Sequence, residues 1–270
     1  MSLTCDTIHI FDENNRGLGN FLYLIATTYG IAYKNNLDVK VESLEYFFSK
    51  WGDKYKKSLF RNINTEKISG KRNKVYEIKK TRNTYKIFEC KNGDELVGYY
   101  QSYKYFDFIR PTILSLFSID DTTKKYISEK YNIILSNYTT ISLHVRRADY
   151  CNLGISLDTA YQNEAVCYIK NLFVETNIKF LVFSDDINWC RDKFIGDEYY
   201  FVQGEDDYVD LYMMSMCNHN IIANSTFSWW GAYLNEKDNK IVIYPKKWFC
   251  NNKRYQQIKE DMFLKNWIEI

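Results

Sequence analysis

Four polar or charged side chains stand where an apolar, strand-like run ends: His144, Arg146, Arg147 and Asp149. The run itself, Thr139–Val145, is rich in β-branched and apolar residues, as is typical of a strand buried in a parallel sheet. Because side chains alternate along an extended chain, we expect His144 and Arg146 on one face of the strand and Arg147 on the other. An imidazole beside a guanidinium suits a phosphate oxygen. A cluster of arginine–aspartate ion pairs that closes the strand end explains the same residues without a ligand.

Two further polar clusters follow apolar runs later in the chain. Ser184–Asp186 ends one such run, and Asn224–Ser228 follows another. In an open parallel sheet ligands bind outside the carboxyl ends of the strands, so we expect all three clusters on one edge. Hydroxyl groups at a helix start, beside free backbone N–H groups and the positive end of the helix dipole, can hold a phosphate. Taken singly, each of these two clusters is explained equally well by helix capping.

Three other residues are candidates for ligand contacts. Asn20 follows a glycine turn, Gly17–Gly19, which could present backbone N–H groups to an anion, although a plain tight turn is the favoured interpretation. Gln101 lies in the aromatic segment Gly98–Phe106, which is either part of a core or a wall on which a sugar stacks. Asp210 is either a surface acid of a helix or an acceptor for the base edge of guanine, and we favour the surface acid.

The elements that must position these residues alternate between strands and helices in the second half of the chain. The predicted order is a strand at 139–145, a helix at 158–175, a strand at 179–184, a helix that ends at 194, a strand at 199–202, a helix at 208–217, a strand at 220–223, a helix that ends at 234 and a strand at 240–244. This alternation predicts an α/β fold with a doubly wound parallel sheet.

The rest of the chain is less regular. We predict these elements there: a strand at Thr7–Phe11, a helix at Phe21–Lys34, a strand at Thr84–Cys90 and a closing helix at Arg254–Ile270. We expect two domains, an N-terminal α/β domain at 1–120 and a C-terminal domain at 121–270. The closing helix is a candidate to pack back on the first domain.

Composition narrows the classes of function. The 270 residues carry 36 basic and 34 acidic side chains, a net charge of +2, so nucleic acid is not expected as a partner and any anion site must be local. The 7 cysteines form no CxxC pair, which indicates reduced thiols and a cytoplasmic protein. No apolar run reaches the roughly 20 residues that cross a bilayer, while peripheral association with a membrane is compatible with the sequence.

Two missing motifs bear on the reaction. The sequence holds no phosphate-binding P-loop, which argues against an ATPase or kinase of that type. It also holds no Asp-x-Asp triplet, the arrangement with which many sugar transferases bind a metal. We therefore expect no metal and no bound cofactor. A departing phosphate would then be stabilised by cationic side chains and amide dipoles, and Arg146 and Arg147 are suited to that task.

Five segments together resemble glycosyltransferase family 11, the α-1,2-fucosyltransferases. Three are strong matches in order along the chain: HVRRADY (His144–Tyr150), FSDDINWC (Phe183–Cys190) and IIANSTFSWWGAYL (Ile221–Leu234). Two are lesser matches: GLGN (Gly17–Asn20) and YYQSYKYF (Tyr99–Phe106). The resemblance implies a GT-B-like α/β fold, with two Rossmann-like domains facing across a cleft. It implies inverting, metal-independent transfer of L-fucose from GDP-fucose to a terminal galactose of a glycan acceptor.

The resemblance also implies roles for individual residues. The residues implied to bind the donor are His144, Arg147, Asp185, Asp186, Ser225, Thr226, Phe227, Ser228 and Asn20. Arg146 is implied to hold the pyrophosphate and to stabilise the charge that develops on it. Asp149 is our candidate for the general base, and its alternative role is a structural ion pair with Arg147. Gln101 and Tyr150 are candidate contacts to the acceptor.

The chain departs from the family pattern at three positions. Arg16 and Ala148 stand where glycine is usual, and Phe21 stands where glutamine is usual. The altered loop at Arg16 and Phe21 leaves open a non-catalytic relative that binds a nucleotide or a glycan. Transfer from another GDP-sugar, such as GDP-mannose, is a further alternative, because only the family motifs select fucose.

Overall fold

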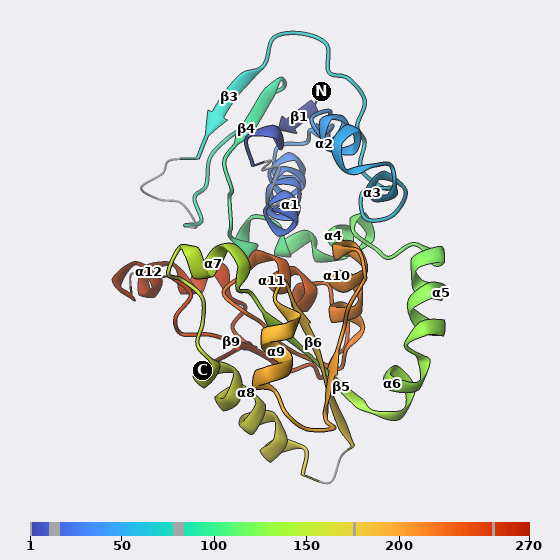
Figure 1. Cartoon of the computed structure of the whole chain (residues 1–270). Coiled ribbons are helices and arrows are strands. Elements are labelled where there is room, and N and C mark those ends of the chain that lie inside the picture. The colour runs from blue at the N-terminus through green and yellow to red at the C-terminus, as the bar shows by residue number, and fades with distance from the viewer. Residues whose placement is uncertain (1, 11–16, 78–83, 175–176, 250–251) are drawn as a thin grey trace. The chain divides into compact units, whose positions relative to one another are not determined.

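The chain divides into two compact α/β units. The computed structural model describes residues 2–10, 17–77, 84–174, 177–249 and 252–270. Unit 1 comprises Met1–Asp120 with Gln257–Leu264, and unit 2 comprises Asp121–Gln256 with Lys265–Ile270. Each unit is built on its own sheet, and the strand pairs of both sheets are parallel (Figure 1). None of the described helices is both long and apolar enough to cross a membrane.

Unit 1 has a four-stranded sheet in the order β2-β1-β4-β3. Its strands are β1 (Ser2–Cys5), β2 (Asp38–Val39), β3 (Asn73–Tyr76) and β4 (Asp94–Val97). Its helices are α1 (Leu18–Lys34), α2 (Leu44–Trp51), α3 (Lys54–Lys57) and α4 (Arg110–Leu116), with short 3-10 helices η1 (Ile8–Ile10), η3 (Tyr103–Tyr105) and η4 (Asp107–Ile109). Helix α1 is apolar on almost every side and is correspondingly buried along most of its length.

Two strands predicted for unit 1 are wrong. The described part of Thr7–Phe11 forms the short helix η1, and the first strand lies earlier, at Ser2–Cys5; Phe11 itself is outside the described residues. Thr84–Cys90 has no regular structure. Its Phe88 ring instead packs at 6.0 Å from the ring of Tyr100, so this apolar segment is stabilised by ring contacts and not by sheet pairing.

Phe21, which replaces the glutamine usual in the family, is a core residue of unit 1. Its side chain is fully buried in α1, and its ring makes an edge-to-face contact with Phe47 at a centroid distance of 5.0 Å. The substitution is therefore explained by packing, and it gives no support to a loop altered for another ligand. Arg16 lies outside the described residues.

Unit 2 has a six-stranded sheet in the order β10-β9-β8-β5-β6-β7. Its strands are β5 (Thr139–Val145), β6 (Ile178–Ser184), β7 (Tyr199–Phe201), β8 (His219–Ile221), β9 (Val242–Tyr244) and β10 (Ile268–Glu269). Its helices are α5 (Asp121–Lys130), α6 (Asn132–Asn137), α7 (Ala148–Asn152), α8 (Thr159–Leu172), α9 (Ile187–Lys193), α10 (Asp207–Met216) and α11 (Thr226–Tyr233). The predicted alternation is confirmed, including all of β5. The predicted closing helix is partly wrong, because α12 (Asn252–Met262) ends early and a strand follows it.

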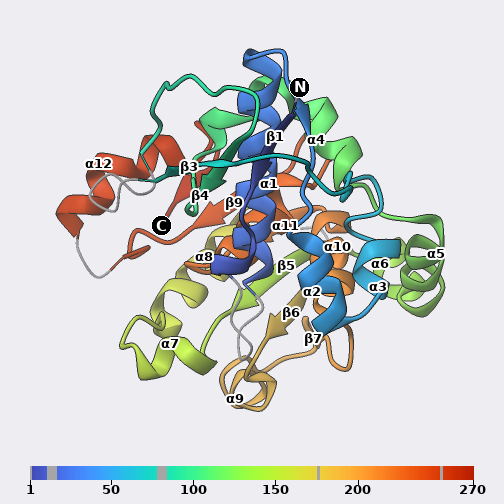
Figure 2. The same ribbon diagram turned by 90° about the horizontal axis from the view of Figure 1, so that it is seen from above.

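The two faces of the unit 2 sheet are covered by different helices. Leu143 and Val145 belong to an apolar cluster with residues of α8 and α9, which lie on the same side of the sheet (Figure 1). On the opposite face, Asn220 donates to the Ser142 hydroxyl at 2.7 Å and to the backbone carbonyl of Met214 in α10 at 2.8 Å. Helices α10 and α11 are neighbours on that side (Figure 2). Gly231 allows their close approach, because a Cβ atom there would lie 2.8 Å from the Met214 Cβ.

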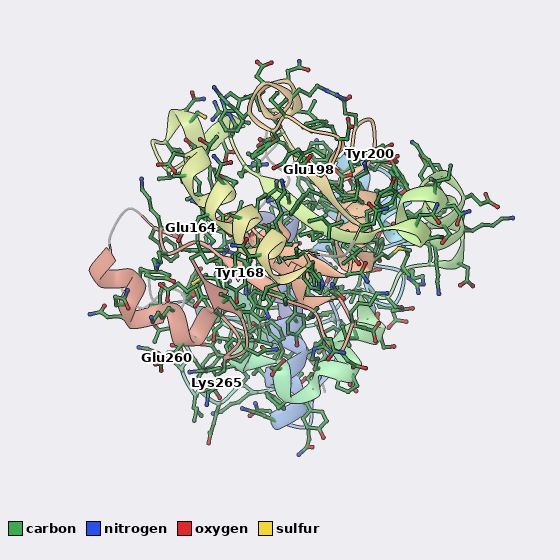
Figure 3. The ribbon with its side chains drawn as sticks, turned by 90° about the horizontal axis from the view of Figure 1, so that it is seen from below. Glu164, Tyr168, Glu198, Tyr200, Glu260 and Lys265 are labelled. Carbon is green, nitrogen blue, oxygen red and sulfur yellow. The ribbon has the colours of Figure 1, made fainter. Side chains whose placement is uncertain are left out.

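Helix α8 shows how burial fixes the orientation of one covering helix. Its buried stripe is centred on Gln162, Ala165 and Ile169. Tyr168 lies beside this stripe and is 37% exposed, so it is a surface residue and not the core residue that its spacing from Tyr161 suggests. Figure 3 shows the Tyr168 side chain on α8, with Glu164 on the same helix.

Candidate functional site

The three polar clusters predicted from the sequence meet at the carboxyl edge of the unit 2 sheet. Strand β5 lies between β6 and β8, with Val145 paired to Ser184 and Leu143 paired to Ile221. All three strands are parallel, so the residues that follow them emerge on the same edge. The predicted convergence of the clusters is therefore present in the structure.

The side chains at the end of β5 alternate as predicted. The ring of His144 points to the α11 side, where its centroid lies 5.7 Å from that of Phe227. Arg147 lies on the α9 side, with its guanidinium carbon 3.8 Å from the centre of the Trp189 ring. The strand thus presents one group to each of the two helices that begin at this edge.

Arg146 is held by two carboxylates. One terminal nitrogen, Nη1, lies 3.0 Å from Asp185 Oδ2, and the other, Nη2, lies 2.8 Å from Asp149 Oδ1. The guanidinium also lies 5.5 Å from the ring centre of Tyr150. The alternative pairing of Asp149 with Arg147 is wrong, because α7 begins at Ala148 and brings the Asp149 carboxylate back to Arg146, three residues earlier.

Arg147 is held differently. Its backbone N–H donates to Asp185 Oδ1 at 2.8 Å, and its Nε donates to Asp186 Oδ2 at 3.1 Å. Asp186 also caps α9, because its Oδ1 accepts the backbone N–H of Trp189 at 3.2 Å. Among the described residues, nothing pairs with the two terminal nitrogens of Arg147. Within the described part of the chain, the terminal donors of Arg147 are therefore unpaired, whereas both terminal nitrogens of Arg146 are engaged.

His144 is a neutral imidazole in this structure. Burial, with a further contribution from the positive charge of Arg146, lowers the pKa of His144 to about 3. Its Nδ1 is buried, and no described residue forms a hydrogen bond with it. A neutral ring can donate from one nitrogen and accept at the other, so His144 is suited to a polar ligand group.

The start of α11 forms the third side of the site. Ser225 caps this helix, with its hydroxyl oxygen accepting the backbone N–H of Phe227 at 3.3 Å. The Ser228 hydroxyl, also predicted to bind the donor, is buried and donates to the backbone carbonyl of Ser225 at 3.3 Å. Thr226 is the first residue of the helix. Tyr150 reaches the same segment, because its hydroxyl donates to the Asn224 backbone carbonyl at 3.2 Å.

Asp210, one turn into α10, is not the surface acid that we favoured from the sequence. Its Oδ1 is buried, and no described residue forms a hydrogen bond with it. Burial raises the pKa of Asp210 to about 8, with further contributions from the negative charges of Glu205, Asp207 and Asp206. The helix packing that buries this carboxyl could not be read from the sequence. Helices α10 and α11 both begin at the carboxyl edge, so Asp210 lies on the side of the site toward which His144 points.

Two predicted site residues lie together in unit 1. Gln101 Nε2 donates to Asn20 Oδ1 at 2.7 Å. Asn20 belongs to the first turn of α1, and Gln101 precedes η3, so the two lesser sequence motifs are joined by a direct hydrogen bond. The structure thus gathers the predicted residues into two groups, one in each unit.

The charges at the edge of unit 2 nearly cancel. Two guanidiniums, Arg146 and Arg147, face three carboxylates, Asp149, Asp185 and Asp186. In the described ranges, no group of three or more His, Cys, Asp or Glu side chains is arranged to hold a metal ion. An anionic ligand must therefore compete with carboxylates for Arg146, while it finds the terminal nitrogens of Arg147 available.

Similar solved structures and a matching family profile define the class of this protein. The fold is similar to that of the fucosyltransferase NodZ from Bradyrhizobium, with a TM-score of 0.57 over 85% of this chain and 90% of that chain at 11% identity. NodZ structures include one co-crystallized with GDP, at a TM-score of 0.56. The predicted GT-B-like α/β fold is confirmed. The chain belongs to glycosyl transferase family 11, whose profile matches residues 55–270.

Relatives at the level of sequence carry glycosyltransferase names. The O-antigen biosynthesis glycosyltransferase WbnK of Escherichia coli is 32% identical over all of this chain and 90% of its own length. An alpha-1,2-colitosyltransferase of Escherichia coli is 32% identical over 59% of this chain and 57% of its own length. Galactoside alpha-(1,2)-fucosyltransferase 1 of Leontopithecus chrysomelas is 27% identical over 65% of this chain and 52% of its own length. The chain thus spans most of WbnK but about half of the other two.

Sequence reasoning missed one feature of the site, the stack of Arg147 on Trp189. The signal was present, because Trp189 stands three residues after a helix-capping Asp186, and a cap of that geometry places the residue at the helix start. The sequence alone did not show that β5 pairs with β6. This pairing places the residues that follow β5 against α9, the helix that follows β6.

Proposed function

We propose that this glycosyltransferase moves L-fucose from GDP-fucose to the 2-hydroxyl of a terminal galactose on a glycan, with inversion and without a metal or bound cofactor. Family membership supports the proposal, as do a relative named as a galactoside α-1,2-fucosyltransferase and NodZ structures named with GDP and with GDP-fucose. The observation that carries it is the convergence of two guanidiniums and a capped helix start on one sheet edge. We expect the reaction to take place in the cytoplasm.

The diphosphate is assigned to the end of β5 and the start of α11. Arg146 would exchange its Asp149 contact for an oxygen of the β-phosphate. That exchange is inexpensive, because the Arg146 and Asp149 side chains are 23% and 36% exposed and ion pairs of this kind contribute little. The positive end of the α11 dipole, at Thr226, would complete the phosphate site.

Guanine is assigned to the α10 side of the same edge. Guanine offers two adjacent N–H donors, and a carboxylate is their natural acceptor. Asp210 is a buried carboxyl whose Oδ1 has no hydrogen-bond partner among the described residues, so a ligand that donates to it removes the cost of that unsatisfied atom. His144 would contact the nucleoside between Asp210 and the arginines.

The transfer itself needs charge stabilisation and a base. The acceptor hydroxyl oxygen attacks the anomeric carbon of fucose, the bond from that carbon to the β-phosphate oxygen breaks, and its electron pair leaves with GDP. The sugar passes through an oxocarbenium-like state, and negative charge grows on the phosphate that Arg146 would contact. Asp149 would take the hydroxyl proton. Because Arg146 binds Asp149 in the unliganded protein, donor binding would release the base.

Gln101 of unit 1 and Tyr150 of unit 2 are each proposed, separately, as a contact to the acceptor. Gln101 is oriented by its hydrogen bond to Asn20, which fixes its amide group, and amides of this kind bind sugar hydroxyls. Tyr150 is anchored through its hydroxyl to Asn224, so its ring face is held near Arg146 and could stack on a sugar.

The direct test is a donor and acceptor panel with purified protein. GDP-fucose with a β-galactoside should yield GDP and a fucosyl product whose NMR spectrum shows an α-1,2 linkage. The 2-deoxygalactoside is the matched control and should yield no product. Failure of GDP-fucose together with transfer from GDP-mannose would overturn the donor assignment, and absence of transfer from every GDP-sugar would overturn the proposal.

A second candidate donor has one specific observation in its favour. The relative named as an alpha-1,2-colitosyltransferase is as similar to this chain as WbnK is, although over a shorter stretch. Colitose is a deoxy relative of fucose, so a site that makes few contacts to the sugar would accept both. Including GDP-colitose in the same panel distinguishes the two donors through their kcat/KM values.

A further inference from the structure

We propose that Trp189 is a positioning residue that holds Arg147 ready for the diphosphate of the donor. This inference rests on the proposed function, because it concerns the same edge of unit 2. Trp189 touches no expected part of the substrate, and it would act only through the guanidinium that lies on its ring.

The first observation is the stack itself. The Arg147 guanidinium carbon lies 3.8 Å from the centre of the Trp189 ring, and the side chain of Arg147 is 20% exposed. Tryptophan is the aromatic side chain that attracts a cation most strongly, and the attraction increases as water is excluded. Trp189 in turn packs against the apolar cluster beneath α9, so the ring is a fixed platform and not a mobile surface group.

The second observation is that one carboxylate, Asp186, binds both partners of the stack. Asp186 accepts the Arg147 Nε with one oxygen and the Trp189 backbone N–H with the other. The carboxylate therefore fixes both partners of the stack relative to each other. Asp185 fixes the Arg147 backbone from the other side. With ring, Nε and backbone all held, the remaining freedom of the guanidinium is small.

The third observation concerns the terminal nitrogens of the Arg147 guanidinium. The two terminal nitrogens of Arg147 have no partner among the described residues, and both are donors. A preoriented guanidinium with free donors binds an anion without first giving up a protein contact and without losing rotamer freedom on binding. Arg146 has the opposite character, because both of its terminal nitrogens are already paired.

The test is calorimetry with GDP as the probe and a double-mutant cycle as the readout. Without the ring the Arg147 side chain must be ordered when the ligand binds, at a cost of about 0.5–1.5 kcal/mol, so Trp189→Leu should weaken GDP binding by about 2- to 13-fold. In an Arg147→Ala background the same substitution should change the affinity by less than about 2-fold, because the residue through which Trp189 acts is gone. Trp189→Phe, which keeps a ring under the guanidinium, should restore most of the affinity.

The chain supplies a matched control on the same helix. Arg191 of α9 lies 4.7 Å from the ring centre of Phe201, the last residue of β7, and neither residue is assigned to the donor site. Phe201→Leu removes an arginine–aromatic contact of the same kind, and it should leave GDP affinity unchanged. Melting temperatures of all variants separate a general loss of stability from an effect on the site.

The outcomes separate this inference from the function on which it rests. Wild-type affinity in Trp189→Leu, or an equal loss with and without Arg147, would overturn the role of Trp189 and leave the proposed function standing. Wild-type protein that binds inorganic pyrophosphate but not GDP would contradict the nucleotide assignment, and the cycle with pyrophosphate would still decide the role of Trp189. Wild-type protein that binds neither would overturn both.

Discussion

Binding of GDP should release close to one proton from Asp210 at pH 7. Burial and the nearby charges of Glu205, Asp207 and Asp206 raise the pKa of this carboxyl to about 8 in the unliganded protein. Guanine donates two N–H groups, and hydrogen bonds of that kind favour the ionised carboxylate. If Asp210 accepts them, its pKa falls on binding and the proton leaves to the solvent.

The number of protons released follows from the pKa of Asp210. At pH 7, about one unit below it, roughly nine-tenths of the Asp210 carboxyl groups are protonated. Full ionisation in the complex then releases about 0.9 proton per GDP. The terminal phosphate of GDP, with a second pKa near 6, adds only about 0.1 proton at pH 7. The carboxyl is therefore the dominant source of released protons.

The assay is isothermal titration calorimetry of GDP binding in buffers that differ in their ionisation enthalpy. The slope of the observed enthalpy against the buffer enthalpy gives the number of protons released. Asp210→Asn keeps an acceptor oxygen and almost the same shape, so its GDP binding should weaken by about 10-fold and still be measurable. It should release only the small phosphate contribution.

Equal proton release by wild type and Asp210→Asn would refute the guanine assignment. A second measurement checks the pKa without any ligand. The folded-state pKa, about 8, lies above the unfolded value of 3.8, so the folded state binds more protons between these pH values. The stabilisation that Asp210 contributes is fully present below about pH 4 and is lost as the pH rises through 8. Between pH 6 and 8 the free energy of unfolding should fall by about 2 kcal/mol more in wild type than in Asp210→Asn, as measured by urea denaturation.

Three further predictions concern the reaction. Arg146→Ala should lower kcat by about 10²–10³ while circular dichroism shows an intact fold, because one donor to the departing phosphate is lost, and wild-type turnover would contradict that role. Asp149→Asn should abolish the acidic limb of the pH–rate profile, and a limb that persists unchanged would remove Asp149 as the base. If no metal takes part, EDTA leaves turnover unchanged, whereas a loss that Mg²⁺ or Mn²⁺ restores would contradict metal-independent transfer.

The strands of unit 2 other than β10 could be predicted because burial leaves an apolar run in the sequence. β5 and β6 are such runs, and both were found within one residue of their observed bounds. The strands of unit 1 are shorter and more polar. β4 begins with two buried acidic residues, so its pattern did not indicate a strand: Glu95 pairs with Arg72, and Asp94 accepts the backbone N–H of Lys91.

The convergence of the site could be predicted because parallel topology alone brings strand exits together. The ion-pair and hydrogen-bond partners of the individual side chains could not be predicted. Whether Arg146 or Arg147 binds a given carboxylate depends on where α7 and α9 begin after the strands, to within a single residue. Asp210 was assigned to the surface for a similar reason, since only the packing of α10 buries its carboxyl.

The two adjacent arginines that follow β5 have different surroundings, because their side chains leave the chain in opposite directions. Arg146 faces two carboxylates with which a diphosphate must compete, although breaking these partly exposed pairs costs little. Arg147 rests on a ring with its terminal donors free, so it can capture the anion first. Capture at Arg147 would then bring the phosphate to Arg146 and displace Asp149. In this order of events the base would become free only after the donor is bound, which would tie proton removal from the acceptor to the presence of a leaving group.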